Sequence, residues 1–136
     1  MLVRDVMVES VLTVTPEQTL RDALELLQSK RIRQVPVLED GRLVGIITDR
    51  DIKRATPSIL SHIDRAEYDG VLDQTLVRQL MTREPMTITP DAPLKSAVKI
   101  FISRKVGALP VLEDGVLVGL ITQADALRVL YDMLEE

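Results

Sequence analysis

Apolar residues at intervals of three and four, the spacing that places side chains on one face of a helix, occur in two stretches of the chain. The positions concerned are Leu20, Ala23, Leu24 and Leu27, and then Leu94, Ala97, Val98 and Phe101. Thr19 and Pro93 precede these stretches, and both residue types suit the start of a helix. The pattern therefore predicts an amphipathic helix in each half of the chain.

A β-rich run follows each predicted helix and ends in an Asp-Gly pair, at 40–41 and at 114–115. An Asp-Gly pair between two such runs is a strong signal for a β-hairpin. The runs that follow the turns, 43–47 and 117–121, are continuously apolar, which predicts strands buried on both faces.

Two further elements complete each half. The apolar stretches 11–14 and 86–88 precede a Thr-Pro pair, a turn signal, and predict a short first strand. A second helix is expected from about residue 49 and from about residue 123. Each half therefore has the predicted element order β-α-β-β-α.

The two halves are copies of one unit. Residues 2–54 and 76–128 align without a gap at an offset of 74, and 23 of the 53 positions are identical. One such unit is too small to be comfortably stable alone, so we expect two units to share a face about a pseudo-twofold axis. The predicted fold class is mixed α/β (α+β), with a first domain at 1–60, a connector at 61–75 and a second domain at 76–136.

The connector is too long to lack structure in a compact domain. We expect a helical turn near 58–62 and a further helix around 64–72. His62 lies near three acidic residues, Asp64, Glu67 and Asp69. This cluster is a possible metal site, but a single histidine in a polar connector is more often simply solvated, and we predict no metal.

Composition narrows the classes of function. The chain has 136 residues with a net charge of −4, which argues against a broad nucleic-acid surface. The absence of cysteine excludes disulfides, thiolate catalysis and cysteine metal ligands. The sequence contains neither the apolar run of a signal peptide nor a membrane span, so a cytoplasmic location is expected. No catalytic motif is present, and we predict that the protein is not an enzyme.

The ordered set Met7, Thr15-Pro16, an amphipathic helix, 35–37, Asp40-Gly41, 45–48 and Asp51, repeated from Leu76, resembles the cystathionine β-synthase (CBS) domain. Each motif alone is weak, but the ordered set occurs twice. The resemblance covers the whole chain and implies a stand-alone CBS pair. It further implies a homodimer, a disc of four units, that binds AMP, ADP, ATP or S-adenosylmethionine between its domains and regulates another protein in trans.

The resemblance also suggests which residues bind the ligand. Thr48 and Asp51, with Thr122 and Asp125 in the second copy, match the family's phosphate- and ribose-binding residues. A helix start also presents backbone N–H groups that suit a phosphate. The same Thr-x-x-Asp spacing is a capping box that any helix can use, so both interpretations stay open.

The copies differ in charge at the candidate site. Copy one has Arg33 and Arg50, at positions that contact phosphate in some family members, where copy two has Gly107 and Ala124. We therefore expect the stronger phosphate site in copy one, although both arginines could be ordinary surface residues.

Because the chain has few aromatic residues, aliphatic side chains would have to flank the adenine ring. The candidates by family position are Val11, Leu12, Val35, Ile46, Met86, Leu109 and Leu120. For each of them, packing in the core is the more common explanation, because a Leu or Val in a strand needs no ligand to explain it.

Two functional hypotheses follow. The first is a regulatory module that senses an adenosine compound and changes shape, so that a partner responds to the population of one arrangement. The second is a ligand-free structural dimerisation or adaptor module, in which Thr48 and Thr122 only cap helices. A catalytic subunit is a third and weaker possibility.

Overall fold

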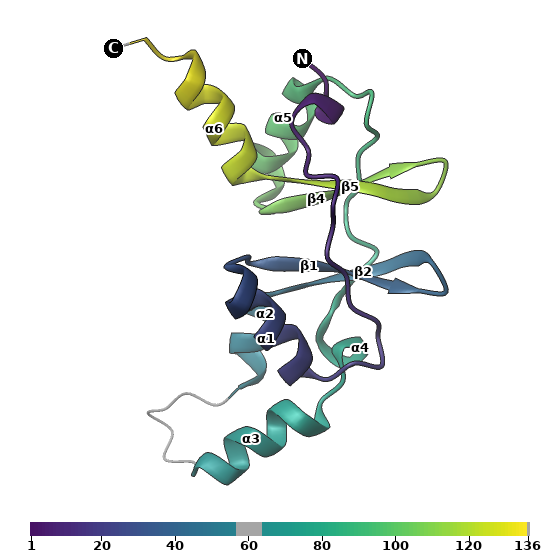
Figure 1. Ribbon diagram of the computed structural model, residues 1–136, viewed down its shortest axis with the longest axis vertical. Coiled ribbons are helices and arrows are strands. Elements are labelled where there is room, and N and C mark those ends of the chain that lie inside the picture. The colour runs from purple at the N-terminus through teal and green to yellow at the C-terminus, as the bar shows by residue number, and fades with distance from the viewer. Residues whose placement is uncertain (57–63, 136) are drawn as a thin grey trace. The chain divides into compact units, whose positions relative to one another are not determined.

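The computed structural model describes residues 1–56 and 64–135 (Figure 1). Its helices are η1 (Val3–Asp5, a 3-10 helix), α1 (Leu20–Lys30), α2 (Asp49–Ala55), α3 (Arg65–Gln74), α4 (Val77–Leu80), α5 (Leu94–Arg104) and α6 (Gln123–Met133). Its strands are β1 (Gln34–Glu39), β2 (Arg42–Thr48), β3 (Thr82–Arg83), β4 (Ala108–Glu113) and β5 (Val116–Thr122). The predicted mixed α/β class is confirmed.

The chain forms two compact units whose composition differs from that of the sequence repeats. Leu12–Glu84 makes one unit, here called the β1–β2 unit. Met1–Val11 and Pro85–Glu136 make the other, the β4–β5 unit. The start of each copy therefore packs with the hairpin of the other copy.

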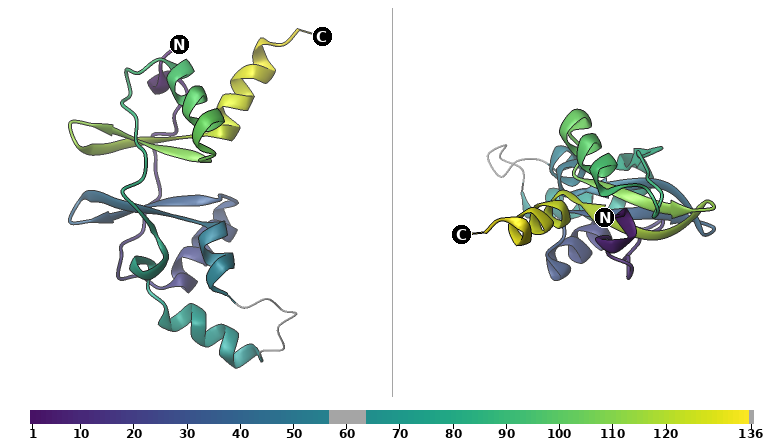
Figure 2. Two further views of the ribbon diagram at one scale, coloured as in Figure 1. Left: turned by 180° about the vertical axis from the view of Figure 1, so that it is seen from behind. Right: turned by 90° about the horizontal axis from the view of Figure 1, so that it is seen from above.

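In each unit two helices lie on one face of an antiparallel hairpin (Figure 2). The predicted Asp-Gly turns are confirmed: Asp40 and Gly41 have φ of 51° and 78°, and Asp114 and Gly115 have φ of 52° and 80°. Two successive left-handed residues make the turn type that matches the twist of a hairpin, and glycine adopts this conformation without strain.

The predicted first helices are also confirmed. Thr19 caps α1 in a capping box with Asp22, in which the Thr19 hydroxyl accepts from the Asp22 backbone N–H at 3.2 Å. Pro93 stands before α5 without a side-chain cap. The buried face of α1 consists of Leu20, Ala23 and Leu27, as the spacing indicated.

The predicted first strands are wrong in extent. Stretch 11–14 contributes a single parallel bridge, Val14 with Val37, and stretch 86–88 contributes Ile88 with Val111. Each stretch runs straight from a bend into a Thr-Pro turn, so only its last apolar residue reaches the hairpin. The partner that sequence reasoning missed is β3, which pairs with β2 through Gly45 and Ile46. In the β4–β5 unit, Val8 bridges Leu120 in the same way.

The second strands are only partly buried on both faces. In β2, Gly45, Ile46 and Ile47 are buried, whereas 43–44 are half exposed. A bulge after Val37 leaves one residue of β2 without a partner and turns this end of the strand outward.

The helix expected around 64–72 is present as α3, capped by the Asp64 carboxylate, which accepts from the Glu67 N–H at 2.8 Å. The turn expected near 58–62, and His62 with it, lies outside the described residues. Over 1–56 and 64–135, no helix combines the length and the apolar character needed to cross a membrane.

Candidate functional site

The end of β2 passes directly into α2, and Thr48 and Asp51 meet at this junction. The Thr48 backbone N–H donates to Oδ2 of Asp51 at 2.9 Å, and the Asp51 N–H donates to the Thr48 hydroxyl at 3.1 Å. The Asp49 N–H donates to the backbone oxygen of Arg33 at 2.9 Å, which brings the start of β1 to the same place. The predicted residues Arg33, Thr48 and Asp51 are therefore neighbours.

The end of β5 repeats this geometry at the start of α6. Thr122 N–H donates to Oδ2 of Asp125 at 2.9 Å, and Asp125 N–H donates to the Thr122 hydroxyl at 3.2 Å. The Gln123 N–H donates to the Gly107 oxygen at 3.0 Å, as Asp49 does to Arg33. The capping interpretation is thus correct for both pairs, and it leaves each hydroxyl hydrogen and one carboxylate oxygen for another partner.

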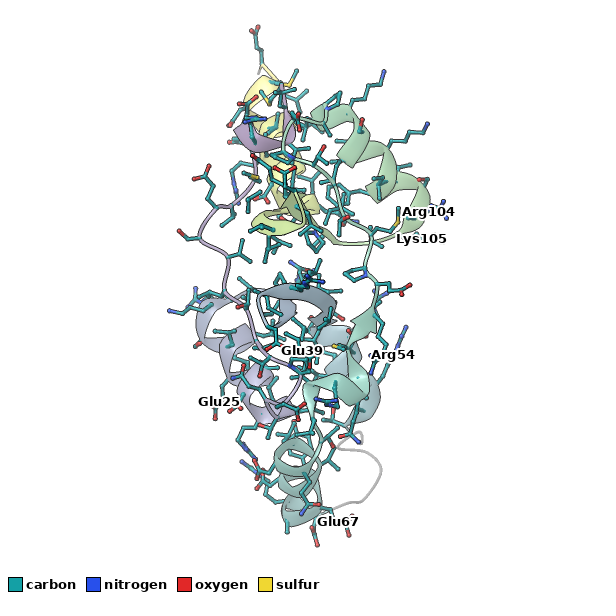
Figure 3. All side chains as sticks on the ribbon, turned by 90° about the vertical axis from the view of Figure 1, so that its right-hand side faces the viewer. Glu25, Glu39, Arg54, Glu67, Arg104 and Lys105 are labelled. Atoms are coloured by element: carbon teal, nitrogen blue, oxygen red, sulfur yellow. The ribbon has the colours of Figure 1, made fainter. Side chains whose placement is uncertain are left out.

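The two carboxylates differ in what their second oxygen contacts. Oδ1 of Asp125 lies 3.5 Å from Nη1 of Arg128, and the Asp125 residue is 7% exposed. Asp51 is half-buried, and its Oδ1 has no hydrogen-bond or ion-pair partner among residues 1–56 and 64–135. Arg54, the counterpart of Arg128, stands exposed on α2 (Figure 3) and forms no ion pair with Asp51. Asp51 is therefore the more available acceptor.

The two candidate phosphate-binding arginines are present at the first junction alone, because the second has Gly107 and Ala124 in their places. Arg33 and Arg50 are exposed and form no ion pair with any described residue. The backbone N–H groups at the start of α2 are less available to a phosphate than expected. Of the first three, those of Asp49 and Asp51 already donate hydrogen bonds within the chain. An anion at this junction would rely on the two guanidinium groups.

The apolar candidates divide by exposure. Val35 and Leu109 are fully buried within the two hydrophobic cores, so core packing accounts for them. Ile46 is 8% exposed but belongs to neither core cluster, so core packing does not account for it in the same way. Val11 and Leu120 are half-buried. Leu12 and Met86 are 42% and 39% exposed, which makes them the apolar candidates with the most surface to offer a ligand. Val11 belongs to the β4–β5 unit and Leu12 to the β1–β2 unit.

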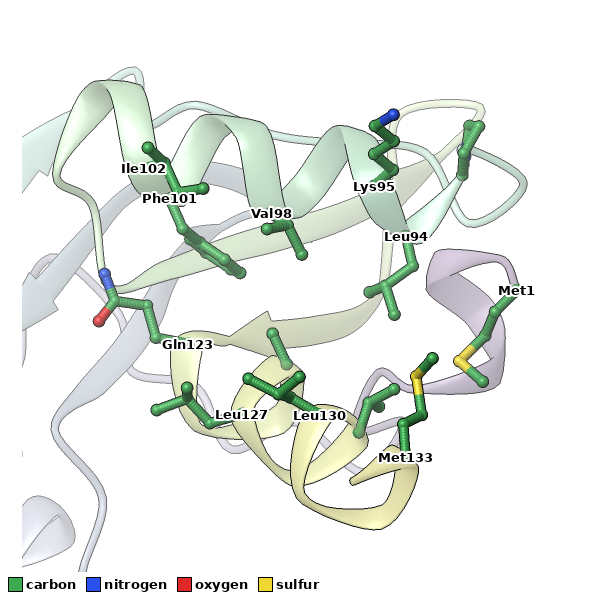
Figure 4. Close-up of a pocket in the computed structure, with 13 residues that line it drawn as sticks. Met1, Leu94, Lys95, Val98, Phe101, Ile102, Gln123, Leu127, Leu130 and Met133 are labelled. Atoms are coloured by element: carbon green, nitrogen blue, oxygen red, sulfur yellow. The ribbon is translucent and has the colours of Figure 1, made fainter. Parts of the chain in front are cut away.

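The sequence interpretation did not identify a groove between α5 and α6 (Figure 4). Its volume is about 660 Å³. The groove is apolar apart from Lys95 and Gln123, and it is lined by Met1, Pro93, Leu94, Lys95, Val98, Phe101, Ile102, Gln123, Ala126, Leu127, Val129, Leu130 and Met133. The sequence signal for this groove was the helical spacing of apolar residues in α5 and along α6 as far as Met133. The same spacing is found in helices that pack into a core, so it did not indicate a groove.

Comparison with known proteins gives a consistent result. The family model described as the CBS domain matches residues 3–58 and 77–132. A CBS domain-containing protein of Dictyostelium discoideum is 37% identical over 136 residues, covering 98% of this chain and 94% of the relative.

Solved structures agree over the whole chain. CBSX2 in complex with AMP matches with a TM-score of 0.79 and 28% identity, covering 97% of each chain. The CBS domain pair of protein MJ0100, in complex with 5′-methylthioadenosine and S-adenosyl-L-methionine, matches with a TM-score of 0.79 and 25% identity, covering 96% of this chain and 99% of that one.

Proposed function

Because this chain belongs to the CBS domain family, we propose that it is a regulatory module that binds an adenosine nucleotide or S-adenosylmethionine and catalyses no reaction. Of the similar structures, CBSX2 is in complex with AMP, and the CBS domain pair of protein MJ0100 is in complex with 5′-methylthioadenosine and S-adenosyl-L-methionine. The observation that carries the proposal for this chain is Oδ1 of Asp51, which has no partner among the described residues and lies beside the Thr48 hydroxyl, together with Arg33 and Arg50, which form no ion pair there.

Each group at this junction has a chemical task. Oδ1 of Asp51 accepts a hydrogen bond from a ribose hydroxyl, while Oδ2 keeps its bond to the Thr48 N–H. The Thr48 hydroxyl accepts from the Asp51 N–H and still has its own hydrogen to donate to a phosphate oxygen. Arg33 and Arg50 neutralise the phosphate charge, and exposed Leu12 offers apolar surface to the base.

The second junction binds the same class of ligand more weakly in this proposal. Asp125 already contacts Arg128, and Gly107 and Ala124 supply no charge. A ligand without phosphate suits this junction better than AMP does.

Ligand binding then shifts the population of conformations, and a partner protein that binds one conformation better is regulated in trans. Because adenine nucleotides are intracellular metabolites, we place the protein in the cytoplasm.

The test compares AMP with adenosine by calorimetric titration of the purified chain. Asp51→Asn keeps an acceptor for the Thr48 N–H but loses the carboxylate charge. It is expected to lower the affinity for both AMP and adenosine about 10- to 100-fold, the equivalent of one charge-assisted hydrogen bond. The double variant Arg33→Ala with Arg50→Ala should remove the preference for AMP over adenosine. Asp125→Asn is the matched control and should change AMP affinity much less.

A second function has one observation in its favour. Thr19 and Asp22 form the same capping box as Thr48 and Asp51, so this motif alone does not mark a ligand site. If no adenosine compound binds ligand-free protein, the chain is better described as a structural adaptor. A thermal-shift panel of AMP, ADP, ATP and S-adenosylmethionine decides between the two, because a ligand at 100 times its dissociation constant adds about 2.7 kcal/mol of stability.

We also infer that the chain forms a homodimer. Tyr131 and Leu134, which do not line the α5–α6 groove, are 77% and 60% exposed, and apolar side chains at the surface favour association. Light scattering at micromolar concentration is expected to give twice the mass of 15.2 kDa. A monomer under these conditions would contradict the inference.

A further inference from the structure

Asp125 is the one charged residue that is buried within residues 1–56 and 64–135, with 7% of its surface exposed. Burying a carboxylate costs stability unless its oxygens have partners. Its Oδ2 accepts from the Thr122 N–H at 2.9 Å, and its Oδ1 lies 3.5 Å from Nη1 of Arg128. Arg128 is therefore the partner of the oxygen that a ribose hydroxyl would need at the second junction.

The helix that carries Arg128 directs this side chain toward Asp125. Side chains on an α-helix lean toward its N-terminus, so a long residue reaches the position three residues before it. Arg128 lies within α6, which continues past it as far as Met133, so the backbone at this position is held on both sides. The side chain itself is 70% exposed, and it can therefore turn into solvent without disturbing the core.

The counterpart arginine of copy one is placed differently. Arg54 lies in the last turn of α2, which ends at Ala55. A cation at the C-terminal end of a helix is stabilised by the helix dipole, and this gives Arg54 an alternative to pairing with Asp51. Oδ1 of Asp51 has no partner in the described part of the chain. The two copies thus have the same residues at the same spacing, but only in copy two does the arginine pair with the carboxylate.

We propose that Arg128 competes with the hydroxyl groups of the ligand for Asp125, and that it thereby sets the affinity of the second junction below that of the first. This inference rests on the proposed function and assigns Arg128 as a specificity-determining residue. A ribose hydroxyl that donates to Oδ1 of Asp125 displaces the guanidinium group into solvent. A neutral ligand breaks this ion pair and offers Arg128 no anion in return. The chain consequently responds to its ligand in two separate ranges of concentration.

The experiment titrates adenosine, which has ribose hydroxyls but no phosphate, into the ¹⁵N-labelled full chain. Amide signals of residues 48–51 report on the first junction and those of 122–125 on the second, so one titration gives both dissociation constants. Arg128→Met keeps a long side chain and a good helix former, but it cannot donate to the carboxylate. The matched control is Arg54→Met in copy one.

In the Arg128→Met chain, the dissociation constant at 122–125 is expected to fall about two- to fivefold, the range that corresponds to an ion pair at the surface. The constant at 48–51 should stay the same, and Arg54→Met should change neither. Salt separates competition from a merely structural role, because it weakens the ion pair but not the hydrogen bonds of a neutral ligand. Raising sodium chloride from about 0.05 to about 0.5 M should therefore strengthen binding at 122–125 in the native chain and not in Arg128→Met.

The results distinguish this inference from the proposed function on which it rests. Unchanged or weaker binding at 122–125 in the Arg128→Met chain, while the signals of 48–51 still respond to adenosine, would overturn the role of Arg128 alone. The same holds if the signals of 122–125 respond in neither chain. If adenosine moves the signals of neither junction in any of the three chains, the proposed function fails together with this inference.

Discussion

Replacing Gly45 with alanine is expected to destabilise the protein by about 1–3 kcal/mol, the usual cost of overpacking a filled site. A methyl group at this position of β2 would lie 2.8 Å from Sδ of Met81 and 2.9 Å from the backbone oxygen of Thr82. The methionine side chain can move aside, but the oxygen belongs to the segment that pairs with Gly45 through β3. Either the pairing is disturbed or the strand shifts.

Urea unfolding followed by circular dichroism measures this effect. The control is Gly70→Ala in α3, where the added methyl group meets no atom within 4 Å. Alanine in a helix interior is favoured over glycine by about 0.5–1 kcal/mol, so this variant should be more stable than the native chain. If Gly45→Ala lowers the stability and Gly70→Ala raises it, the space around the added methyl group decides the change in stability, and not the loss of glycine itself. Equal stability of both variants would contradict the interpretation.

Gly119 extends the same argument to the other unit. Its added methyl group would lie 2.5 Å from Sδ of Met7 but 3.1 Å from the backbone oxygen of Val8. Met7 and Met81 correspond at the offset of 74, and each packs over a glycine of the opposite repeat's hairpin. The contacts at Gly45 and Gly119 indicate that the missing side chain makes room for close packing by the chain itself.

Local patterns predicted the helices and hairpins well because their causes are local. Apolar spacing, the Thr19 cap and the Asp40-Gly41 turn each involve residues a few positions apart. The third strand was missed because its partners are distant: 82–83 pair with Gly45 and Ile46, and the two-residue segment has no β pattern of its own. The exchange of segments between the repeats was missed for the same reason.

The candidate site shows a similar division. The Thr-x-x-Asp spacing correctly predicted that Thr48 lies beside Asp51 and Thr122 beside Asp125. It could not predict that Asp125 also contacts Arg128 while Oδ1 of Asp51 has no partner in the part of the chain that the structure describes, because both copies have an arginine three residues after the aspartate, Arg54 and Arg128. The difference comes from the exposed side chain's conformation, which residue type does not determine.

Truncation of Leu72 to alanine is the second large effect that we expect, a loss of about 2–5 kcal/mol. Leu72 is 2% exposed and belongs to the core cluster that includes Leu20, Leu27 and Ile52, so its removal leaves a cavity beneath α3. Chemical unfolding measures the loss. Glu25→Ala serves as the control, because Glu25 is exposed on α1 and its truncation should change stability by less than about 0.5 kcal/mol.

The segment of the Leu72→Ala variant that unfolds first should also be identifiable residue by residue. The remaining contacts of α3 include the partly buried Tyr68 and the partly exposed pairs of Arg21 with Asp69 and Asp73, and ion pairs at the surface contribute only about 0.2–1 kcal/mol each. Without Leu72, α3 should therefore open before the hairpin does. Native-state hydrogen exchange would then be faster in α3 than in β1 and β2. Uniformly faster exchange through the whole β1–β2 unit would mean instead that α3 and the hairpin unfold as one cooperative element.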